Sequence, residues 1–292
     1  SNPYGELMVN YSDSYSYNLN ANLTLLFKIM KGLTFSVQGG YDYDHSPSYS
    51  FKSKLEAPGA INSMNNTSNM HNYWQNTNNL TWQRQFGDHN VTAMAVWEIS
   101  RSWDTGLQGT GSNLNNESVG YWNIANAAIR NASNSYTEAS LASGIIRANY
   151  DYKKRYFITA ALRADGSSKF QGNNKWGYFP SVGLGWRLSQ ESFLKSNKVI
   201  TNLKIRSSFG ITGNQEIGNY KSLAQLTGSN YTDGSSVIYG FKESIGNGDL
   251  KWERTTQLDL GFDLGLWNRM DIAFDYYIRN TNDLLYDVPI PS

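Results

Sequence analysis

Apolar and polar residues alternate with a period of two along much of the chain. In residues 15–29 the odd positions are all aromatic or aliphatic, whereas the even positions as far as Thr24 are Ser, Asn or Thr. In a β-strand this spacing places the two kinds of side chain on opposite faces. The alternation breaks at 30–32 and resumes over 33–43. The pattern therefore predicts two long strands joined by a tight turn.

Four more pairs of alternating segments follow. They are 72–86 with 90–100, 140–152 with 156–165, 177–188 with 202–212, and 252–266 with 270–278. The turns within the pairs are mostly short, and only 190–196 leaves room for a helical turn. The connections between the pairs are long and rich in Asn, Ser, Gly and Thr, and they cover 45–71, 101–139, 166–176 and 213–249.

This sidedness defines the predicted fold class. Short periplasmic turns at one end of the strands and long extracellular loops at the other are typical of outer-membrane barrels. We therefore expect an all-β fold, namely a section of an antiparallel transmembrane β-barrel. Under this interpretation the strand from Tyr15 descends toward the periplasm and the strand from Leu33 returns.

Charged residues within the predicted strands test this interpretation. An Arg or Lys that faces lipid at mid-bilayer costs about 2–4 kcal/mol, so charges should share the parity of the polar positions. Most of them do: Arg163, Arg187, Lys204, Arg206, Asp259, Asp263, Asp271 and Asp275. Arg84 and Arg254 have the apolar parity, but both lie near strand ends, where the penalty is smaller. Aromatic residues gather toward both ends of the strands, as the girdles of membrane barrels do.

A soluble β-sandwich with one hydrated face is the alternative to a membrane barrel. Strands of soluble proteins are typically about five or six residues long, whereas a tilted strand needs roughly nine to eleven residues to cross a bilayer. The alternating segments here extend over about ten to sixteen residues, so their length favours the barrel.

Composition removes several classes of protein. The 292 residues include no cysteine, which excludes disulfides, thiolate metal sites and thiol chemistry. A formal charge of +1 provides no basic field for nucleic acid. No stretch approaches the roughly 18 consecutive apolar residues of a membrane helix. The mean hydropathy of -0.53 is compatible with a barrel, because half of each strand faces a polar lumen.

One succession of short motifs is more specific than periodicity. It consists of RADGSSKF at 163–170, FPS at 179–181, GWRLS at 185–189, ESFL at 191–194, LKIRSSFG at 203–210 and TGNQEIGNY at 212–220. This succession resembles the SusC/RagA-like TonB-dependent transporters of Bacteroidetes outer membranes. The motifs cover roughly 141–290, and the part before them matches mainly in its barrel pattern.

The resemblance implies a barrel of about 22 strands that is plugged by an N-terminal domain and imports oligosaccharides or peptides. The implied partners are a SusD-like surface lipoprotein, TonB acting through the plug and N-terminal region, and outer-membrane lipid. The sequence contains no plug and no TonB box. About ten strands are visible, another begins near 286–292, and ten or eleven strands cannot close a barrel of that size. Residues 1–292 are therefore expected to form one partial barrel domain that lacks both barrel ends.

Catalysis has little support in the sequence. His45, His71 and His89 lie in connections or beside a turn without HExxH or paired ligand spacing. There is no GxSxG elbow and no Walker loop, so no catalytic residue, metal site or cofactor is predicted. Asp42 and Asp44 alternate on one strand face and are interpreted as hydrated wall rather than as a cation site.

Binding is the better hypothesis. Sugars are held by flat aromatic faces together with amide and carboxylate groups, and the long connections supply both. The candidate substrate-binding residues are Trp103, Asp104, Tyr121, Trp122, Asn123, Tyr231, Asp233 and Tyr239. The alternative is that these side chains pack loop against loop or contact the lipoprotein. The competing function is a non-transporting carbohydrate-binding or adhesin-like β-module, and a soluble enzyme ranks third.

Overall fold

The computed structural model describes residues 7–56, 58–233, 236–244 and 246–286, without the side chains of 56 and 225–244. These residues form long β-strands and short 3₁₀ turns. The first six strands are β1 (Tyr11–Ser14), β2 (Tyr17–Met30), β3 (Leu33–Lys52), β4 (Ser63–Phe86), β5 (His89–Leu114) and β6 (Ala127–Tyr152). The others are β7 (Tyr156–Ser167), β8 (Trp176–Arg187), β9 (Ile200–Asn214), β10 (Gln225–Asp233), β11 (Ser236–Ser244), β12 (Glu253–Leu266) and β13 (Met270–Asn282).

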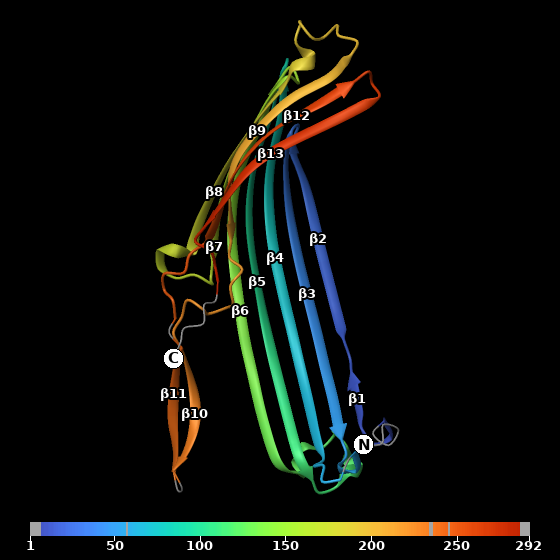
Figure 1. Ribbon diagram of the computed structural model, residues 1–292, viewed down its shortest axis with the longest axis vertical. Coiled ribbons are helices and arrows are strands. Elements are labelled where there is room, and N and C mark those ends of the chain that lie inside the picture. The colour runs from blue at the N-terminus through green and yellow to red at the C-terminus, as the bar shows by residue number, and fades with distance from the viewer. Residues whose placement is uncertain (1–6, 57, 234–235, 245, 287–292) are drawn as a thin grey trace. The chain divides into compact units, whose positions relative to one another are not determined.

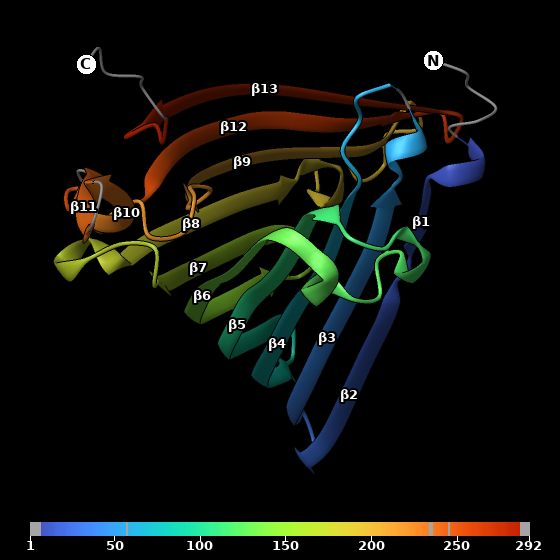
Figure 2. The ribbon, with the colours of Figure 1, turned by 90° about the horizontal axis from the view of Figure 1, so that it is seen from below.

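Most of these strands pair with the next strand in the chain. Within the described residues an 11-stranded sheet has the order β1-β3-β4-β5-β6-β7-β8-β9-β12-β13, with β2 also paired to β3. The strands β10 and β11 form a separate antiparallel hairpin. In the second of two compact units described below, β7, β8, β9, β12 and β13 lie side by side in that order (Figures 1 and 2). The predicted all-β antiparallel fold is confirmed.

The predicted tight turns are present, and left-handed backbone explains their sharpness. Gly32 (φ +83°) sits in the β2–β3 turn, where a Cβ would lie 2.2 Å from the carbonyl oxygen of Gln83. Two consecutive residues have positive φ in the β6–β7 turn (Lys153 and Lys154) and in the β12–β13 turn (Trp267 and Asn268). Three residues separate the paired strand ends in each of these two turns, and positive φ at two of the three lets the chain reverse this tightly.

Three of the predicted connections differ from the structure. β3 continues to Lys52 and β4 begins at Ser63, so most of 45–71 is strand. Most of 101–139 is also strand, because β5 and β6 extend into it, and 213–249 contains the β10–β11 hairpin. The extensions over 63–71, 101–114 and 127–139 are mostly polar, so they lack the strict apolar alternation that identified the rest, whereas 45–52 places Tyr49 and Phe51 on one face. The strand expected near 286–292 falls mainly on 287–292, which are outside the described residues.

The chain divides into two compact units. The first comprises Ser1–Leu23, Gly39–Gln75 and Ser100–Ala139. Its buried apolar cluster lies where the β3–β4 and β5–β6 connections meet, and consists of Phe51, Met64, Leu114, Tyr121 and Ala127. The second comprises Thr24–Gln38, Asn76–Ile99 and Ser140–Ser292. Its buried cluster is Phe170, Phe179 and Trp252, and the indole N–H of Trp252 donates to the carbonyl of Lys175 (3.0 Å).

Glu117 in η2 (Glu117–Val119) links the β3–β4 and β5–β6 connections of the first unit through hydrogen bonds. Its carboxylate accepts hydrogen bonds from the Ser53 hydroxyl (2.7 Å), the Lys54 backbone N–H (2.9 Å) and the Asn62 amide (2.9 Å). Burial by itself would raise the pKa of Glu117, but these hydrogen bonds outweigh burial and hold the pKa below its usual value. The tips of long strands are thereby fixed by a small, ordered core.

Candidate functional site on the polar face of the sheet

An arginine on the polar face of the second unit joins three neighbouring strands. Gly261 in β12 is paired with Arg206 in β9 on one side and with Asp275 in β13 on the other. The guanidinium crosses Gly261 to reach Asp275, with Nη1 2.5 Å from Oδ1 and Nη2 2.9 Å from Oδ2. Its Nη2 also lies 3.2 Å from Oδ1 of Asp263. This is a bidentate pair with a second carboxylate attached.

Gly261 is part of this geometry because it has no side chain. A Cβ there would lie 2.5 Å from Oδ1 of Asp275, 2.8 Å from the carbonyl oxygen of Phe274 and 3.1 Å from Cζ of Arg206. Any larger residue would occupy the path of the guanidinium. The alternation in the sequence places the charged residues on the correct face but does not single out Gly261. The β12–β13 turn sets the register of the two strands, and counting residues back from this turn pairs Gly261 with Asp275.

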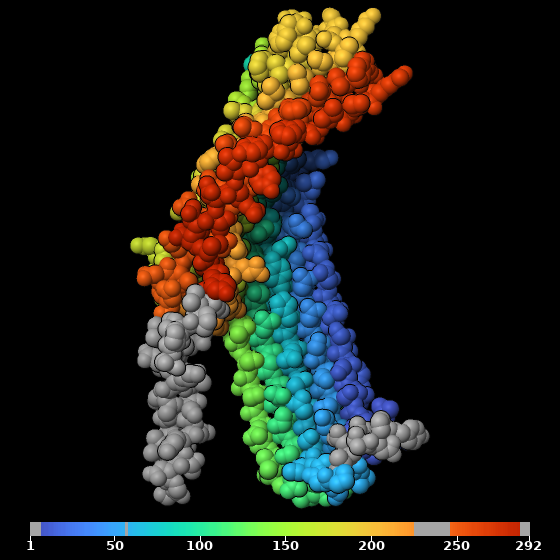
Figure 3. All heavy atoms as spheres, viewed as in Figure 1, coloured from blue at the N-terminus to red at the C-terminus, as the bar shows by residue number. Residues whose placement is uncertain are grey.

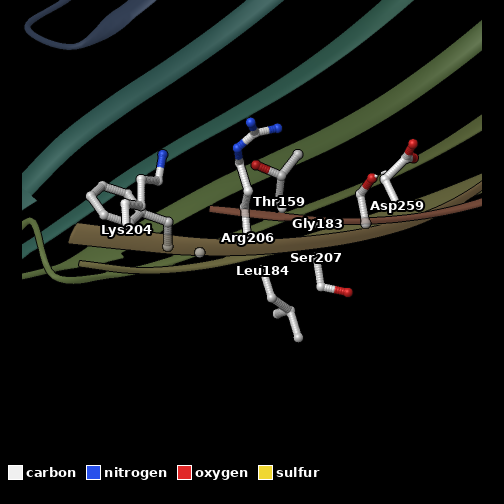
Figure 4. Close-up of a pocket in the computed structure, with 11 residues that line it drawn as sticks. Thr159, Gly183, Leu184, Lys204, Arg206, Ser207 and Asp259 are labelled. Carbon is white, nitrogen blue, oxygen red and sulfur yellow. Dashed lines mark hydrogen bonds between the residues drawn. The ribbon is translucent and has the colours of Figure 1, made fainter. Parts of the chain in front are cut away.

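A shallow groove of about 240 Å³ adjoins this cluster. Thr159, Lys204, Arg206 and Asp259 lie on one side of the sheet, whereas Leu184 and Ser207 point to the other (Figure 4). Gly183 and Gly185 of β8 also line the groove. Its volume is below the roughly 300–1,000 Å³ of pockets that enclose a small ligand. The groove is therefore a feature of a charged, hydrated wall rather than an enclosed ligand pocket.

The charges around the groove have defined partners. Asp259 accepts a hydrogen bond from the Ser208 hydroxyl (3.0 Å) and another from the Gln257 amide (2.7 Å). The ring of Phe157 contacts two cations: its centroid is 5.0 Å from Nζ of Lys204 and 5.5 Å from Cζ of Arg187. The arrangement can bind polar groups and water. It offers neither an activated nucleophile nor a paired acid and base.

The opposite face of the same strands is apolar and uncovered. A groove of about 600 Å³ there is lined mainly by Leu203, Ile205, Leu260, Phe262 and Phe274. Ile205 and Leu260 each keep 47% of their surface exposed, and Phe274 keeps 53%. Leaving one such side chain in water rather than burying it costs about 1.5–3 kcal/mol. This face therefore requires an apolar environment.

The described residues contain no group of three or more His, Cys, Asp or Glu side chains arranged to hold a metal ion. No helix among them is long and apolar enough to cross a membrane.

Trp103 and Asp104 lie within β5 rather than in a loop, and as neighbours in a strand they point to opposite faces. The Arg101 guanidinium lies over the Trp103 ring, with Cζ 5.8 Å from its centroid. Asp104 Oδ1 lies 2.6 Å from Nδ1 of His71, and Thr137 donates to its other oxygen (3.4 Å). The two candidates therefore do not share one binding surface.

The structure brings Tyr121 and Trp122 together, with ring centroids 4.9 Å apart. Tyr121 is buried in the cluster of the first unit, and its hydroxyl donates to Asp13. This hydrogen bond, with burial, raises the pKa of Tyr121 to about 12. Trp122 keeps 76% of its surface exposed and stacks on Tyr49.

The four remaining candidates lie in the β5–β6 connection and in the β10–β11 hairpin. Asn123 caps η3 (Ile124–Asn126) by accepting from the Ala125 N–H (3.1 Å). Tyr231 and Asp233 lie in β10 and Tyr239 in β11, so they belong to a hairpin instead of an irregular loop. Their side chains are outside the described part of the chain. A role in binding stays a prediction for all eight candidates.

An antiparallel sheet of long strands with one charged face and one uncovered apolar face has the characteristics of a membrane β-barrel wall. The comparison with known families agrees. The sequence model described as "TonB dependent receptor-like, beta-barrel" matches residues 2–292, and this chain belongs to that family.

Individual relatives lead to the same family. The chain is 34% identical over 299 residues to TonB-dependent receptor P39 of Formosa agariphila, a match that covers 100% of this chain and 28% of that protein. It is 40% identical over 161 residues to TonB-dependent receptor SusC of Bacteroides thetaiotaomicron, which covers 53% of this chain and 16% of SusC. The chain therefore spans less than a third of the length of these relatives.

Among solved structures, the RagAB peptide transporter is similar to this chain. The TM-score is 0.89 at 26% sequence identity, and the match covers 97% of this chain and 32% of the transporter chain. The resemblance inferred from the sequence motifs is confirmed.

Proposed function

We propose that this chain forms part of the wall of an outer-membrane transporter that imports large nutrients. The observation that carries the proposal is the pair of opposite faces on β9, β12 and β13. Leu260 and Phe274 need an apolar environment, whereas Arg206, Asp263 and Asp275 form a charged network that suits a hydrated lumen. The function of the wall is passive, because it bounds a polar path through the bilayer.

The substrate and partners extend the same proposal. Similarity to SusC and to the RagAB peptide transporter supports an oligosaccharide or a peptide as the imported nutrient. A SusD-like surface lipoprotein would cover the extracellular end, and TonB would supply energy through a plug and N-terminal region rather than through these strands. The protein carries out no reaction of its own in this proposal.

Trp103 and Trp122 are the aromatic residues that we propose for contact with the nutrient or with the lipoprotein. Trp122 is the better placed of the two, because 76% of its surface is exposed beside Tyr49. Flat exposed rings bind sugar faces and peptide side chains alike. The buried Tyr121 would support Trp122 rather than touch the nutrient itself.

Uptake by the full-length protein tests this function. Cells that carry W122A or W103A should show several-fold weaker uptake and nutrient affinity, with wild-type amounts of protein in the outer membrane. The control is L107A, which removes an exposed apolar side chain of β5 and should leave uptake unchanged. Unchanged uptake in both tryptophan variants would reject these residues as contacts. Extraction of the native protein into buffer without detergent would reject the membrane wall.

A further inference from the structure

Basic residues are concentrated in the short turns of the chain. The turn-side segments are 31–32, 84–89, 151–156, 188–199 and 267–269, and together they contain eight Lys or Arg and three Asp or Glu. The connections at the other strand ends are 53–62, 115–126, 168–175 and 215–252, and they contain six of each. Since the whole chain has a net charge of only +1, the excess of positive charge is specific to one end of the strands.

The three acidic residues of the turn-side segments are already engaged. Glu191 accepts from the Tyr156 hydroxyl (2.7 Å) and the Trp186 indole N–H (3.1 Å), and it pairs with Arg155. Asp88 pairs with Lys153 at 3.5 Å. Asp151 accepts from the Asn90 amide and from the Lys154 backbone N–H.

Six basic side chains of these segments remain free. In the described part of the chain, none of them has a carboxylate within ion-pair distance, and all six are exposed. These free turn cations are Lys31, Arg84, Lys154, Lys195, Lys198 and Arg269. Free cations next to a hydrophobic surface are suited to an anionic partner.

Exposed aromatic rings accompany the cations. The guanidinium of Arg84 lies over the ring of Phe86, with Cζ 5.0 Å from its centroid. Phe193, two residues before Lys195, keeps 69% of its surface exposed, and Trp267, two residues before Arg269, keeps 54%. Aromatic rings with a nearby basic group are characteristic of the interface between hydrocarbon and headgroups.

Within the second unit the turn-side segments meet at one end of the strands (Figure 1). In the space-filling view the β8–β9 connection, in yellow, and the β12–β13 turn, in orange-red, both project at this end (Figure 3). The apolar face of β8, which includes Trp186, continues to this end of the strand. The cations therefore follow directly after the surface that requires an apolar environment.

We propose that the free turn cations bind the headgroups of anionic phospholipids in the membrane leaflet that faces the short turns. The phosphate oxygens of the lipid would accept hydrogen bonds from Lys and Arg, while the adjacent rings lie at the boundary between the headgroups and the hydrocarbon. This inference rests on the proposed function, because it needs the apolar face to be in a bilayer. It adds a specific lipid class at a specific end of the wall.

The test uses the full-length protein, delipidated in detergent and reconstituted into vesicles of phosphatidylcholine alone or mixed with phosphatidylglycerol. After re-extraction, mass spectrometry measures the ratio of the two lipids retained by the protein. The test variants are K195Q/K198Q and R84Q. The matched control K54Q/K175Q removes two exposed lysines from the long connections, where the charges balance.

Wild-type protein should retain phosphatidylglycerol in preference, and high salt should reduce the preference. K195Q/K198Q should lower the retained ratio by about two- to five-fold and R84Q by about two-fold, while the control keeps the wild-type ratio. A wild-type protein that inserts but shows no preference overturns the lipid inference alone, as does an equal loss in the control. Failure to insert into either vesicle overturns the membrane-wall proposal itself.

Discussion

Alanine at Gly261 is expected to destabilise the sheet by displacing two of its strands. The new Cβ would lie 2.5 Å from Oδ1 of Asp275 and 2.8 Å from the carbonyl oxygen of Phe274. The carboxylate can rotate away, and the Arg206 pair then breaks. The carbonyl belongs to the backbone of β13, so the second clash is relieved only if β12 and β13 shift relative to each other.

The expected cost is dominated by this backbone shift. Overpacking of a tight site typically costs about 1–3 kcal/mol. The ion pair adds little, because its groups are open to solvent and are screened. We therefore expect the free energy of unfolding to fall by about 1–3 kcal/mol in G261A.

The control is G183A, in the same groove. A Cβ at Gly183 would lie 3.9 Å from Cβ of Ser208 and 4.0 Å from Cβ of Thr159, which are ordinary contacts. Urea unfolding of the full-length protein in micelles, followed by tryptophan fluorescence, would compare the two variants. If G261A is within about 0.5 kcal/mol of G183A, the close approach inferred at Gly261 is wrong.

Three further predictions concern the connections. The pKa of Glu117 is held below its usual value, so ionised Glu117 stabilises the connections fully above about pH 4.5, and this stabilisation is lost as pH falls through the folded-state pKa. Pepsin should therefore cleave 115–126 faster as pH falls through that pKa. E117Q should remove this pH dependence of cleavage. Y121F should remove one tyrosine that ionises only near pH 12, which a spectrophotometric titration would detect as one fewer late-titrating group. W252A should lower the free energy of unfolding by about 3–5 kcal/mol because it removes a large side chain from a buried cluster, and W252F should lower it by less. Urea unfolding measures both variants. Equal losses in W252A and W252F would contradict the packing described for Trp252.

The sequence was most informative where the strands have one apolar face. Alternation over 252–266 and 270–278 predicted β12 and β13 to within a few residues, because a one-residue slip would move Leu260 or Phe274 off the apolar face. In the extended parts of β4 and β5 neither face has to be apolar, so 63–71 and 101–114 were assigned to loops. The β10–β11 hairpin was also missed, although Asp233-Gly234 is a recognisable turn signal in the sequence.

The candidate site was predicted only in part, because its contacts join distant positions in the chain. Arg206 and Asp275 were placed on the polar face, yet their pairing depends on the register of three strands. Tyr121 was selected as an aromatic loop residue, but its burial follows from Asp13 and Phe51, which lie far from it in the sequence. Trp103 and Asp104 were grouped as loop neighbours, and the continuation of β5 separates them onto opposite faces.

The most direct test of the membrane wall measures which side chains of β12 meet lipid. Single cysteines at 258, 259, 260, 262 and 263 in the full-length protein, with its other cysteines replaced if it has any, would be spin-labelled in vesicles. Collision with oxygen and with a water-soluble nickel complex then reports the environment of each label. If the wall lies in a bilayer, labels at 258, 260 and 262 will favour oxygen, while labels at 259 and 263 will favour the nickel complex. Equal accessibility of all five positions to the nickel complex would contradict it.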